Sequence, residues 1–161
     1  MKNVVLFRID DRLIHGQVCT GWIKQCDANE IVCIDDKLVN DTMMQRVLKA
    51  AAPKTTPLSI FTVEQGAEYL MSAEPGHERI IVLVKFPDTI ERLINAGVKI
   101  EKLNLGGLGF RGNRKNITKS VSADEEEIAC LKRILETGTY IFYQMTNRDA
   151  PVDFSTVLAK L

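Results

Sequence analysis

The sequence is poor in the residues that hold metal ions and form disulfides. Its 161 residues include only two histidines, His15 and His77, and no pair of cysteines spaced as C-x-x-C. A zinc site needs closer ligand spacing or more histidines, and neither a P-loop nor a dinucleotide fingerprint is present, so we expect no metal and no other cofactor. The four cysteines are typical of small buried residues in a reducing compartment. They are Cys19, Cys26, Cys33 and Cys130.

An excess of charge of either sign is also lacking. Lys and Arg together number 21, and Asp and Glu together number 21. Nucleic-acid-binding domains usually carry a basic excess gathered on one face, and polybasic membrane anchors carry a local one. The balance therefore argues against both classes, and we expect no nucleic-acid partner.

Long hydrophobic runs are missing. The longest apolar run, Ile80 to Val84, is far below the roughly 18 residues that a membrane-spanning helix requires. The apolar residues Val4 to Phe7 are followed at once by Arg8, without the longer stretch and cleavage site of a secretory signal. We expect a soluble protein of the cytoplasm.

Short apolar runs alternate along the chain with helical patterns, without a linker, a repeat or a low-complexity segment. A chain of this length predicts a single domain over residues 1–161. The short runs are typical of strands that are buried on both faces of a parallel sheet. They are 4–9, 31–34, 58–61, 80–84, 102–105 and 140–143, and a further short strand is expected near 117–121.

Between these runs, apolar residues recur at helical spacing. Pro87-Asp88 begins one expected helix and Gly97 ends it, and Ser122-Ala123-Asp124-Glu125 has the pattern of a capping box at the start of another. The alternation predicts an α/β fold, an open twisted mostly parallel sheet of about six or seven strands with helices on both faces. The apolar sets with helical spacing lie within 18–26, 47–51, 90–94 and 128–135.

This architecture predicts where chemistry takes place. Ligands of open α/β sheets bind in the crevice beyond the carboxyl ends of the strands. The segments expected there are 8–17, 35–41, 62–64, 85–88 and 106–116.

The segment after the first expected strand has the strongest chemical pattern. Arg8, Asp10, Asp11, Arg12 and His15 fall within eight residues. A guanidinium at the end of a buried strand is costly without a partner, so we expect a carboxylate or an anion beside Arg8. A purely structural cluster of ion pairs is the alternative interpretation.

His15 precedes Gly16 at the expected start of a helix. Neutral imidazole is nucleophilic near pH 7, and helix-start amides and arginine side chains are two common means of holding a phosphate. These residue types suggest a histidine that attacks phosphorus, with Asp10 or Asp11 orienting its ring or holding an arginine.

The eleven residues from Arg8 to Val18, RIDDRLIHGQV, resemble the phosphorylation-site segment of IIB components in the mannose/fructose/sorbose class of the sugar phosphotransferase system. The resemblance extends over essentially the whole chain, although 72–78 matches no family segment. Other segments that resemble the family are 34–36, 51–53, 97–98, 104–107 and 120–124.

The resemblance implies a protein-N(pi)-phosphohistidine–sugar phosphotransferase component. His15 would receive a phosphoryl group on Nδ1 from a phosphohistidine on a IIA domain and pass it to a sugar delivered by the membrane components IIC and IID. It also implies a cytoplasmic protein that associates peripherally with the permease. Arg12 would be a phosphate partner and Arg8 a second one, and Asp10, Asp11 and Gly16 would complete the site.

The glycine-rich segment 106–112 follows an expected strand and is a secondary candidate. Backbone amides at glycines such as Gly107 can approach an anion closely, and Arg111 can add charge at the rim of the crevice. A turn without a ligand is the alternative. We expect this segment to lie against the phosphohistidine or the donor protein.

Asp36 and Lys85 end two further strands on the same side of the sheet. Asp36 can bond to the first loop, although a helix-capping role for residues 35–41 is the favoured interpretation. The ammonium group of Lys85 can face the crevice or remain solvated.

A protein-borne phosphoryl group must reach its acceptor. We therefore expect His15 to be accessible and surrounded by the apolar residues Leu13, Ile14 and Phe110. Trp22, at helical spacing with Cys26, is expected in the core rather than at a sugar.

Three other functions use some of the same residue types. Histidine phosphatases place an arginine directly before the histidine, where this chain has Ile14, and need a second histidine, for which His77 is badly placed. Receiver domains place the acceptor aspartate after the third strand, where this chain has Phe61-Thr62. A non-catalytic anion- or nucleotide-binding module stays open, and it predicts that replacing His15 leaves function largely intact.

Overall fold

The computed structural model describes residues 1–72 and 76–161, with the backbone alone for Gln17 and Val18. Within these residues a seven-stranded sheet has the strand order β3-β2-β4-β1-β5-β8-β9. All neighbouring pairs are parallel except β8 and β9, which are antiparallel. The strands are β1 (Val4–Asp10), β2 (Glu30–Ile34), β3 (Leu58–Phe61), β4 (Ile80–Val84), β5 (Lys102–Gly107), β8 (Tyr140–Tyr143) and β9 (Val152–Asp153).

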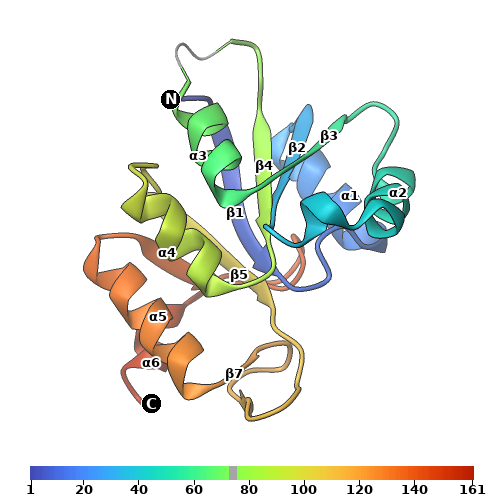
Figure 1. Ribbon diagram of the computed structural model, residues 1–161. Helices are drawn as coiled ribbons and strands as arrows, with labels where there is room; N and C mark the ends of the chain where they lie inside the picture. The colour runs from blue at the N-terminus through green and yellow to red at the C-terminus, as the bar shows by residue number, and fades with distance from the viewer. Residues whose placement is uncertain (73–75) are drawn as a thin grey trace.

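Helices cover both faces of this sheet, as Figure 1 shows. α1 (Gly16–Cys26) and α2 (Thr42–Ala51) lie on one face, together with the short 3-10 helix η1 (Leu38–Asn40). The other face is covered by α3 (Val63–Met71), α4 (Pro87–Asn95), α5 (Glu125–Glu136) and α6 (Phe154–Leu158). A small antiparallel hairpin, β6 (Lys115–Asn116) with β7 (Ser122–Ala123), projects beyond β5. The predicted α/β class is confirmed.

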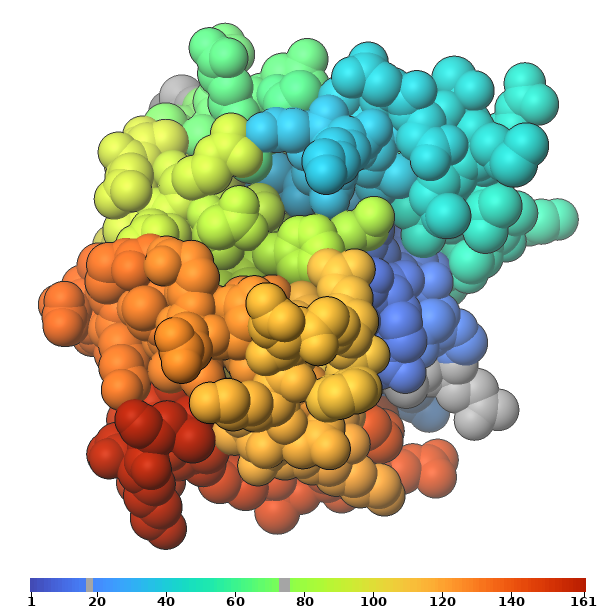
Figure 2. All heavy atoms as spheres, turned by 60° about the horizontal axis from the view of Figure 1, so that its bottom comes forward, coloured from blue at the N-terminus to red at the C-terminus, as the bar shows by residue number. Residues whose placement is uncertain are grey.

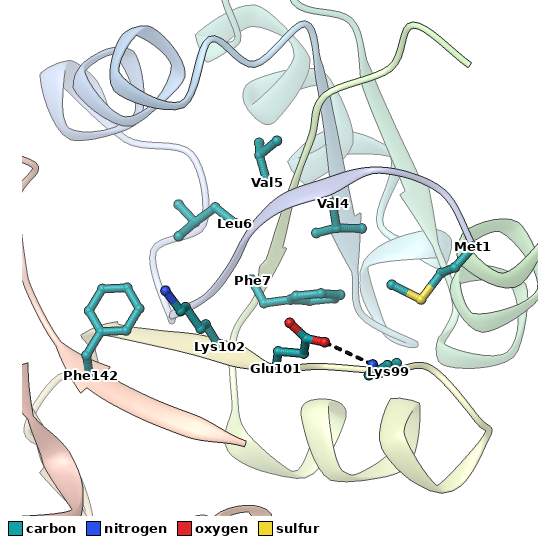
Figure 3. A pocket seen from close by; sticks show the side chains of 9 residues that line it. All are labelled: Met1, Val4, Val5, Leu6, Phe7, Lys99, Glu101, Lys102 and Phe142. Carbon is teal, nitrogen blue, oxygen red and sulfur yellow. Dashed lines mark ion pairs between the residues drawn. The ribbon is translucent and has the colours of Figure 1, made fainter. Parts of the chain in front are cut away.

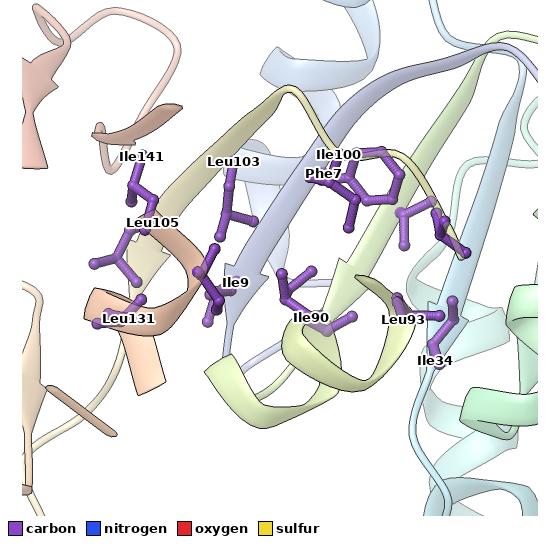
Figure 4. Close-up of a cluster of buried hydrophobic side chains, with 14 of the residues drawn as sticks. Phe7, Ile9, Ile34, Ile90, Leu93, Ile100, Leu103, Leu105, Leu131 and Ile141 are labelled. Carbon is purple, nitrogen blue, oxygen red and sulfur yellow. The ribbon is translucent and has the colours of Figure 1, made fainter. Parts of the chain in front are cut away.

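Each central strand contributes alternate side chains to two hydrophobic cores. In β4, Ile80, Val82 and Val84 join the core beneath α3, α4, α5 and α6, whereas Ile81 and Leu83 join the core beneath α1 and α2. Figure 4 shows Ile90 and Leu93 of α4 among the strand side chains of the first core. Complete burial of each such aliphatic side chain contributes about 1.5–3 kcal/mol.

Two elements differ from the pattern that the sequence predicted. Helix α3 was not expected, although Val63, Ala67 and Leu70 have helical spacing and Thr62 forms a capping box with Gln65. The short strand expected near 117–121 was misplaced. The structure has two-residue strands on either side of it, Lys115–Asn116 and Ser122–Ala123, which pair with each other.

The capping box expected at Ser122 was also misplaced by two residues. Helix α5 begins after Asp124, whose side chain accepts from the amide of Glu127, while the Glu127 side chain accepts from the amide of Asp124. Ser122 lies in β7 and donates its hydroxyl to Asn116 over 2.6 Å. Its hydroxyl therefore serves the hairpin rather than the helix.

The cysteines are free thiols, and three of the four are buried in the cores. Cys26 is half-buried. Burial raises the pKa of Cys130 to about 12 and that of Cys19 to about 11, so both remain protonated near neutrality. Across the two described ranges, no helix is long and apolar enough to cross a membrane.

Candidate active site

Strand β1 presents charged side chains on the face that α1 covers. Phe7 and Ile9 belong to the core beneath α4, and in a strand their neighbours point to the opposite face. Arg8 and Asp10 therefore point toward α1, where only 2 % and 0 % of each residue is exposed. Two charges this deeply buried require partners that replace water.

Asp10 is the centre of the cluster. Its Oδ2 accepts hydrogen bonds from Nη2 of Arg8 over 2.9 Å, from Nη2 of Arg12 over 3.2 Å and from Nε2 of His15 over 3.1 Å. Its Oδ1 accepts from the backbone amide and from Nε of Arg12, each over 3.1 Å. Burial opposes ionisation of Asp10, but the hydrogen bonds from His15 and Arg12 and the charge of Arg8 outweigh it and hold the pKa of Asp10 well below its usual range.

Both terminal nitrogens of Arg8 donate to acceptors of the protein itself. Besides Asp10, its guanidinium donates to the side chain of Asn104 and to the carbonyls of Gln144, over 3.1 Å, and Met145, over 2.8 Å. Gly106 makes room for it, because a Cβ at that position would overlap the guanidinium. Of the two partners expected for Arg8, a carboxylate or a crevice anion, the structure shows the carboxylate.

Arg12 is differently placed, because 49 % of its side chain is exposed. Nε and Nη2 contact Asp10, while Nη1 has no hydrogen-bond partner among the side chains that the structure describes. Gly107 lies close to it, since a Cβ there would be 3.2 Å from Nη2. Arg12 is therefore held by Asp10 through Nε and Nη2, while about half of its side chain stays exposed.

His15 occupies the N-cap position of α1 and is partly exposed, with 23 % of its side chain accessible. Its ring forms no capping hydrogen bond with the helix. The first backbone amides of α1 therefore receive no acceptor from the His15 side chain. Gly16, the first residue of the helix, has a φ of 44°. The inner side of His15 borders a cavity of about 10 Å³ with Leu13 and Trp22. Such a volume holds roughly one water molecule, so a larger group reaches the ring only from outside.

The apolar surroundings of His15 differ from those that the sequence predicted. Leu13 and Ile14 are buried, with 2 % and 5 % exposed, in the core beneath α1. The backbone of Leu13 has a φ of 56°, and its amide donates to the carbonyl of Asp10 over 2.9 Å. Phe110, with 69 % exposed, is the one of the three at the surface. Trp22 is buried as expected, with its ring 5.5 Å from the guanidinium carbon of Arg8.

Asp11 points away from His15 and holds the 106–112 segment. Its Oδ2 accepts from the amide of Gly109 over 2.8 Å and lies 3.5 Å from Nη1 of Arg114. Arg114 is buried, donates to the carbonyl of Gly109 over 2.7 Å and forms a two-pronged ion pair with Glu127 of α5. The hydrogen bonds to Glu127 raise the pKa of Arg114, despite the opposing effect of burial.

Sequence reasoning did not single out Arg114. Its neighbours Asn113 and Lys115 are exposed and polar, so the local pattern carries no sign of a buried arginine. Its partner Glu127 is thirteen residues further along the chain, in the first turn of α5.

The glycine-rich segment is only partly the loop that was expected. Gly106 and Gly107 are the last residues of β5 rather than loop residues, and the amide of Gly109 is already bound by Asp11. Arg111 is exposed and lies over the ring of Phe86, 4.9 Å from its centre. The segment lies beside the first loop, but the amide of Gly109 is not free to bind an anion.

Asp36 and Lys85 do not join the cluster. Asp36 accepts from the amide of Val63 over 2.9 Å and pairs with Arg92 over 2.8 Å, so it holds the start of α3 against α4. The bond from Asp36 to the first loop is not formed. The caps within 35–41 are instead Asp35, which accepts from the amides of Lys37 and Leu38, and Asp41, which accepts from the amide of Met44. Lys85 is half-buried at the end of β4 and forms no ion pair within the described part of the chain.

A larger cavity of about 410 Å³ lies at the other end of β1 (Figure 3). It forms because β1 and β5 pair only from Arg8 and Asn104 onward, so their first residues diverge. Phe7 and Phe142 line it together with the ion pair of Lys99 and Glu101. This end of a parallel sheet is not where α/β proteins place their ligand sites.

The residues in 1–72 and 76–161 contain no group of three or more His, Cys, Asp or Glu side chains arranged to hold a metal ion.

Comparison with known proteins identifies the family. The sequence profile described as "PTS system sorbose subfamily IIB component" matches residues 4–161. The chain is 36 % identical over 160 residues to the "PTS system fructose-specific EIIB component" of Bacillus subtilis, covering 98 % of this chain and 97 % of that one. It is 31 % identical to the "PTS system mannose-specific EIIAB component" of Escherichia coli K12, covering 97 % of this chain and 48 % of that longer protein.

Solved structures agree. The IIBSor domain of the sorbose permease from Klebsiella pneumoniae superposes with a TM-score of 0.93 at 29 % identity, covering 98 % of this chain and 97 % of that one. The manxB structure from Thermoanaerobacter tengcongensis superposes with a TM-score of 0.91 at 34 % identity, covering 99 % of this chain and 97 % of that one.

The fold and these relatives define a sugar-specific transferase component of the phosphotransferase system. Within that system, the chain belongs to the sorbose subfamily of IIB components.

Proposed function

We propose that this chain is a phosphoryl carrier that accepts a phosphoryl group on Nδ1 of His15 from the phosphohistidine of a IIA domain. It then transfers the group to a sugar during uptake through the membrane components IIC and IID, at the cytoplasmic side of the permease. The fused EIIAB relative, of which this chain matches only one part, supports a IIA domain as the donor.

The observation that carries this proposal is the hydrogen bond between His15 and Asp10. Asp10 is ionised and accepts only, so Nε2 of His15 must carry the proton in the 3.1 Å contact. In a neutral imidazole the other nitrogen then holds the lone pair. Nδ1 is therefore the nucleophile, and Asp10 fixes both the tautomer and the orientation of the ring.

The same hydrogen bond makes the transfer reversible. When Nδ1 attacks phosphorus, the new N–P bond forms as the donor's N–P bond breaks, and the ring becomes a cation that keeps its Nε2 proton. The Asp10 carboxylate stabilises that cation. When a sugar hydroxyl attacks in turn, the new P–O bond forms, the N–P bond breaks and Nδ1 regains its lone pair, while the hydroxyl proton leaves to solvent. In this mechanism no residue other than His15 forms or breaks a covalent bond.

The remaining residues bind the phosphoryl group or keep Asp10 and the rim of the site in place. Nη1 of Arg12, on a side chain that is 49 % exposed, and the first amides of α1 after Gly16 are available to bind the phosphoryl oxygens. Arg8 does not touch phosphate and instead fixes Asp10 from below. Asp11 positions the segment that carries Phe110 at the rim.

The test is a reconstituted relay. The chain is incubated with phosphoenolpyruvate, enzyme I, the phosphocarrier protein and a IIA domain, and is then examined by mass spectrometry and by ³¹P NMR, which distinguishes the two phosphohistidine isomers. We expect one acid-labile phosphate on Nδ1 of His15, lost in His15→Gln and kept in the matched control His77→Gln. A protein that carries no phosphate after the incubation, or one that steadily hydrolyses p-nitrophenyl phosphate, would contradict the proposed carrier function.

A further inference from the structure

Helix α2 exposes its apolar side chains instead of burying them. Met43 is 77 % exposed, Val47 55 % and Met44 41 %, whereas Leu48 is the one side chain of α2 that is buried in the core. Met43 and Val47 are four residues apart and so lie next to each other on the helix. Large apolar side chains gathered on an exposed helix face indicate an interaction site. We call Met43, Met44 and Val47 the α2 face.

The α2 face lies beside the proposed acceptor. The chain leaves the carboxyl end of β2 and forms η1, which Asp35 caps through the amides of Lys37 and Leu38, and α2 begins two residues after η1. Beneath the surface, Leu38 and Leu48 share one core with Leu13 and Ile14 of the His15 loop. Figure 2 shows the cyan-to-teal segment of η1 and α2 next to the blue first loop, with the gold 106–116 segment on its other side.

The charge around the α2 face is positive although the whole chain is neutral. Between positions 37 and 56 the basic residues Lys37, Arg46, Lys49 and Lys54 are all exposed, and Asp41 is the one acidic residue. Asp41 is also engaged, because its side chain accepts from the amide of Met44. The surface is apolar in its middle and basic at its edge.

We propose that the α2 face is the docking surface for the phosphoryl-donor domain, which meets it with apolar side chains bordered by acidic ones. This inference rests on the proposed function, because the donor must bring a phosphohistidine to His15. Phe110, on the far side of the first loop, provides a second apolar contact, so that the donor straddles the acceptor. Methionine suits such a contact since its flexible side chain adapts to a partner.

A protein partner fits this surface better than a lipid bilayer does. Helices that lie in the membrane interface use Trp, Phe and Leu on their apolar face, and α2 has no aromatic residue there. A bilayer on this side would also cover His15, which has to be approached by the donor. The basic edge complements the negative charge of a phosphorylated donor.

The experiment measures phosphoryl transfer from the phosphorylated IIA part of the Escherichia coli mannose-specific EIIAB protein to increasing concentrations of this chain. We expect Met43→Glu and Val47→Glu each to raise KM about tenfold while kcat stays close to wild type, because docking is lost and chemistry is not. Arg46→Glu is expected to raise KM as well and to weaken its dependence on salt. Met71→Glu, at a methionine that is 40 % exposed on α3, is the matched control and keeps the wild-type KM.

Phosphorylation of His15 by phosphoramidate, a donor that needs no docking surface, is measured in parallel. A wild-type chain that accepts phosphate from neither donor removes the proposed function itself. A wild type that accepts phosphate, with unchanged KM in Met43→Glu and Val47→Glu, overturns the docking surface alone. Binding of the wild type to phosphatidylglycerol vesicles that Met43→Glu abolishes, with KM unchanged, assigns the α2 face to the membrane instead.

Discussion

Oδ2 of Asp10 lies 3.1 Å from Nε2 of His15 and 2.9 Å from Nη2 of Arg8. One buried oxygen thus joins the side chain of the proposed nucleophile to a cation that is only 3 % exposed. The carboxylate both orients the ring and neutralises the arginine, which makes Asp10 the most sensitive position of the site.

Asp10→Asn removes that charge and leaves Arg8 buried without a counterion. We expect a loss of about 3–5 kcal/mol in the free energy of unfolding, measured by urea denaturation. Phosphoryl acceptance by His15 is expected to slow by about a hundredfold, since the ring loses its anionic partner. Asp36→Asn is the control, because Asp36 is 43 % exposed in its pair with Arg92, and it should cost about 1 kcal/mol without slowing acceptance.

Stability should depend on pH through the same carboxylate. The pKa of Asp10 is lowered in the folded state, so its contribution is complete above the unfolded pKa of about 3.9 and is lost as the pH falls toward the folded pKa. Below pH 4 we expect the wild type to lose up to about 1.4 kcal/mol per pH unit from this group. The carboxyl ¹³C resonance of Asp10 should keep its ionised position down to pH 3, and a midpoint near 4 would refute the lowered pKa.

Gly106→Ala should disturb the site without changing any polar group. The added Cβ would overlap the guanidinium of Arg8, which four hydrogen bonds hold in place. We expect destabilisation of about 1–3 kcal/mol by thermal or urea unfolding. Gly109→Ala is the matched control, since its Cβ would meet the nearest atom, Oδ2 of Asp11, at an ordinary 3.4 Å. Equal stability of the two variants would show that Arg8 can move aside.

Arg114→Lys should loosen the segment that carries Phe110. Lysine cannot keep the two-pronged pair with Glu127 together with the bond to the carbonyl of Gly109. Losing about 2 kcal/mol of local stability would speed amide exchange at Gly109 by about 30-fold, as seen by hydrogen-exchange NMR. Arg133→Lys, in an exposed pair with Glu91, should leave that exchange rate unchanged.

The fold class and the reactive loop were readable from the sequence for simple reasons. Runs such as Ile80 to Val84 can be buried on both faces only in a sheet that helices cover on each side, and the structure has that sheet. The segment from Arg8 to His15 places its charges at the end of one such run, so local order alone brings Asp10, Arg12 and His15 together.

Tertiary structure alone decided which of these groups face one another and which face solvent. Arg8 meets the carbonyls of Gln144 and Met145 because β5 brings β8 close to β1, and no local pattern records that contact. Likewise, Leu13 and Ile14 became core residues while Met43 stayed exposed. Spacing along a chain sets which side chains share a face, but whether that face is covered depends on elements that are distant in sequence.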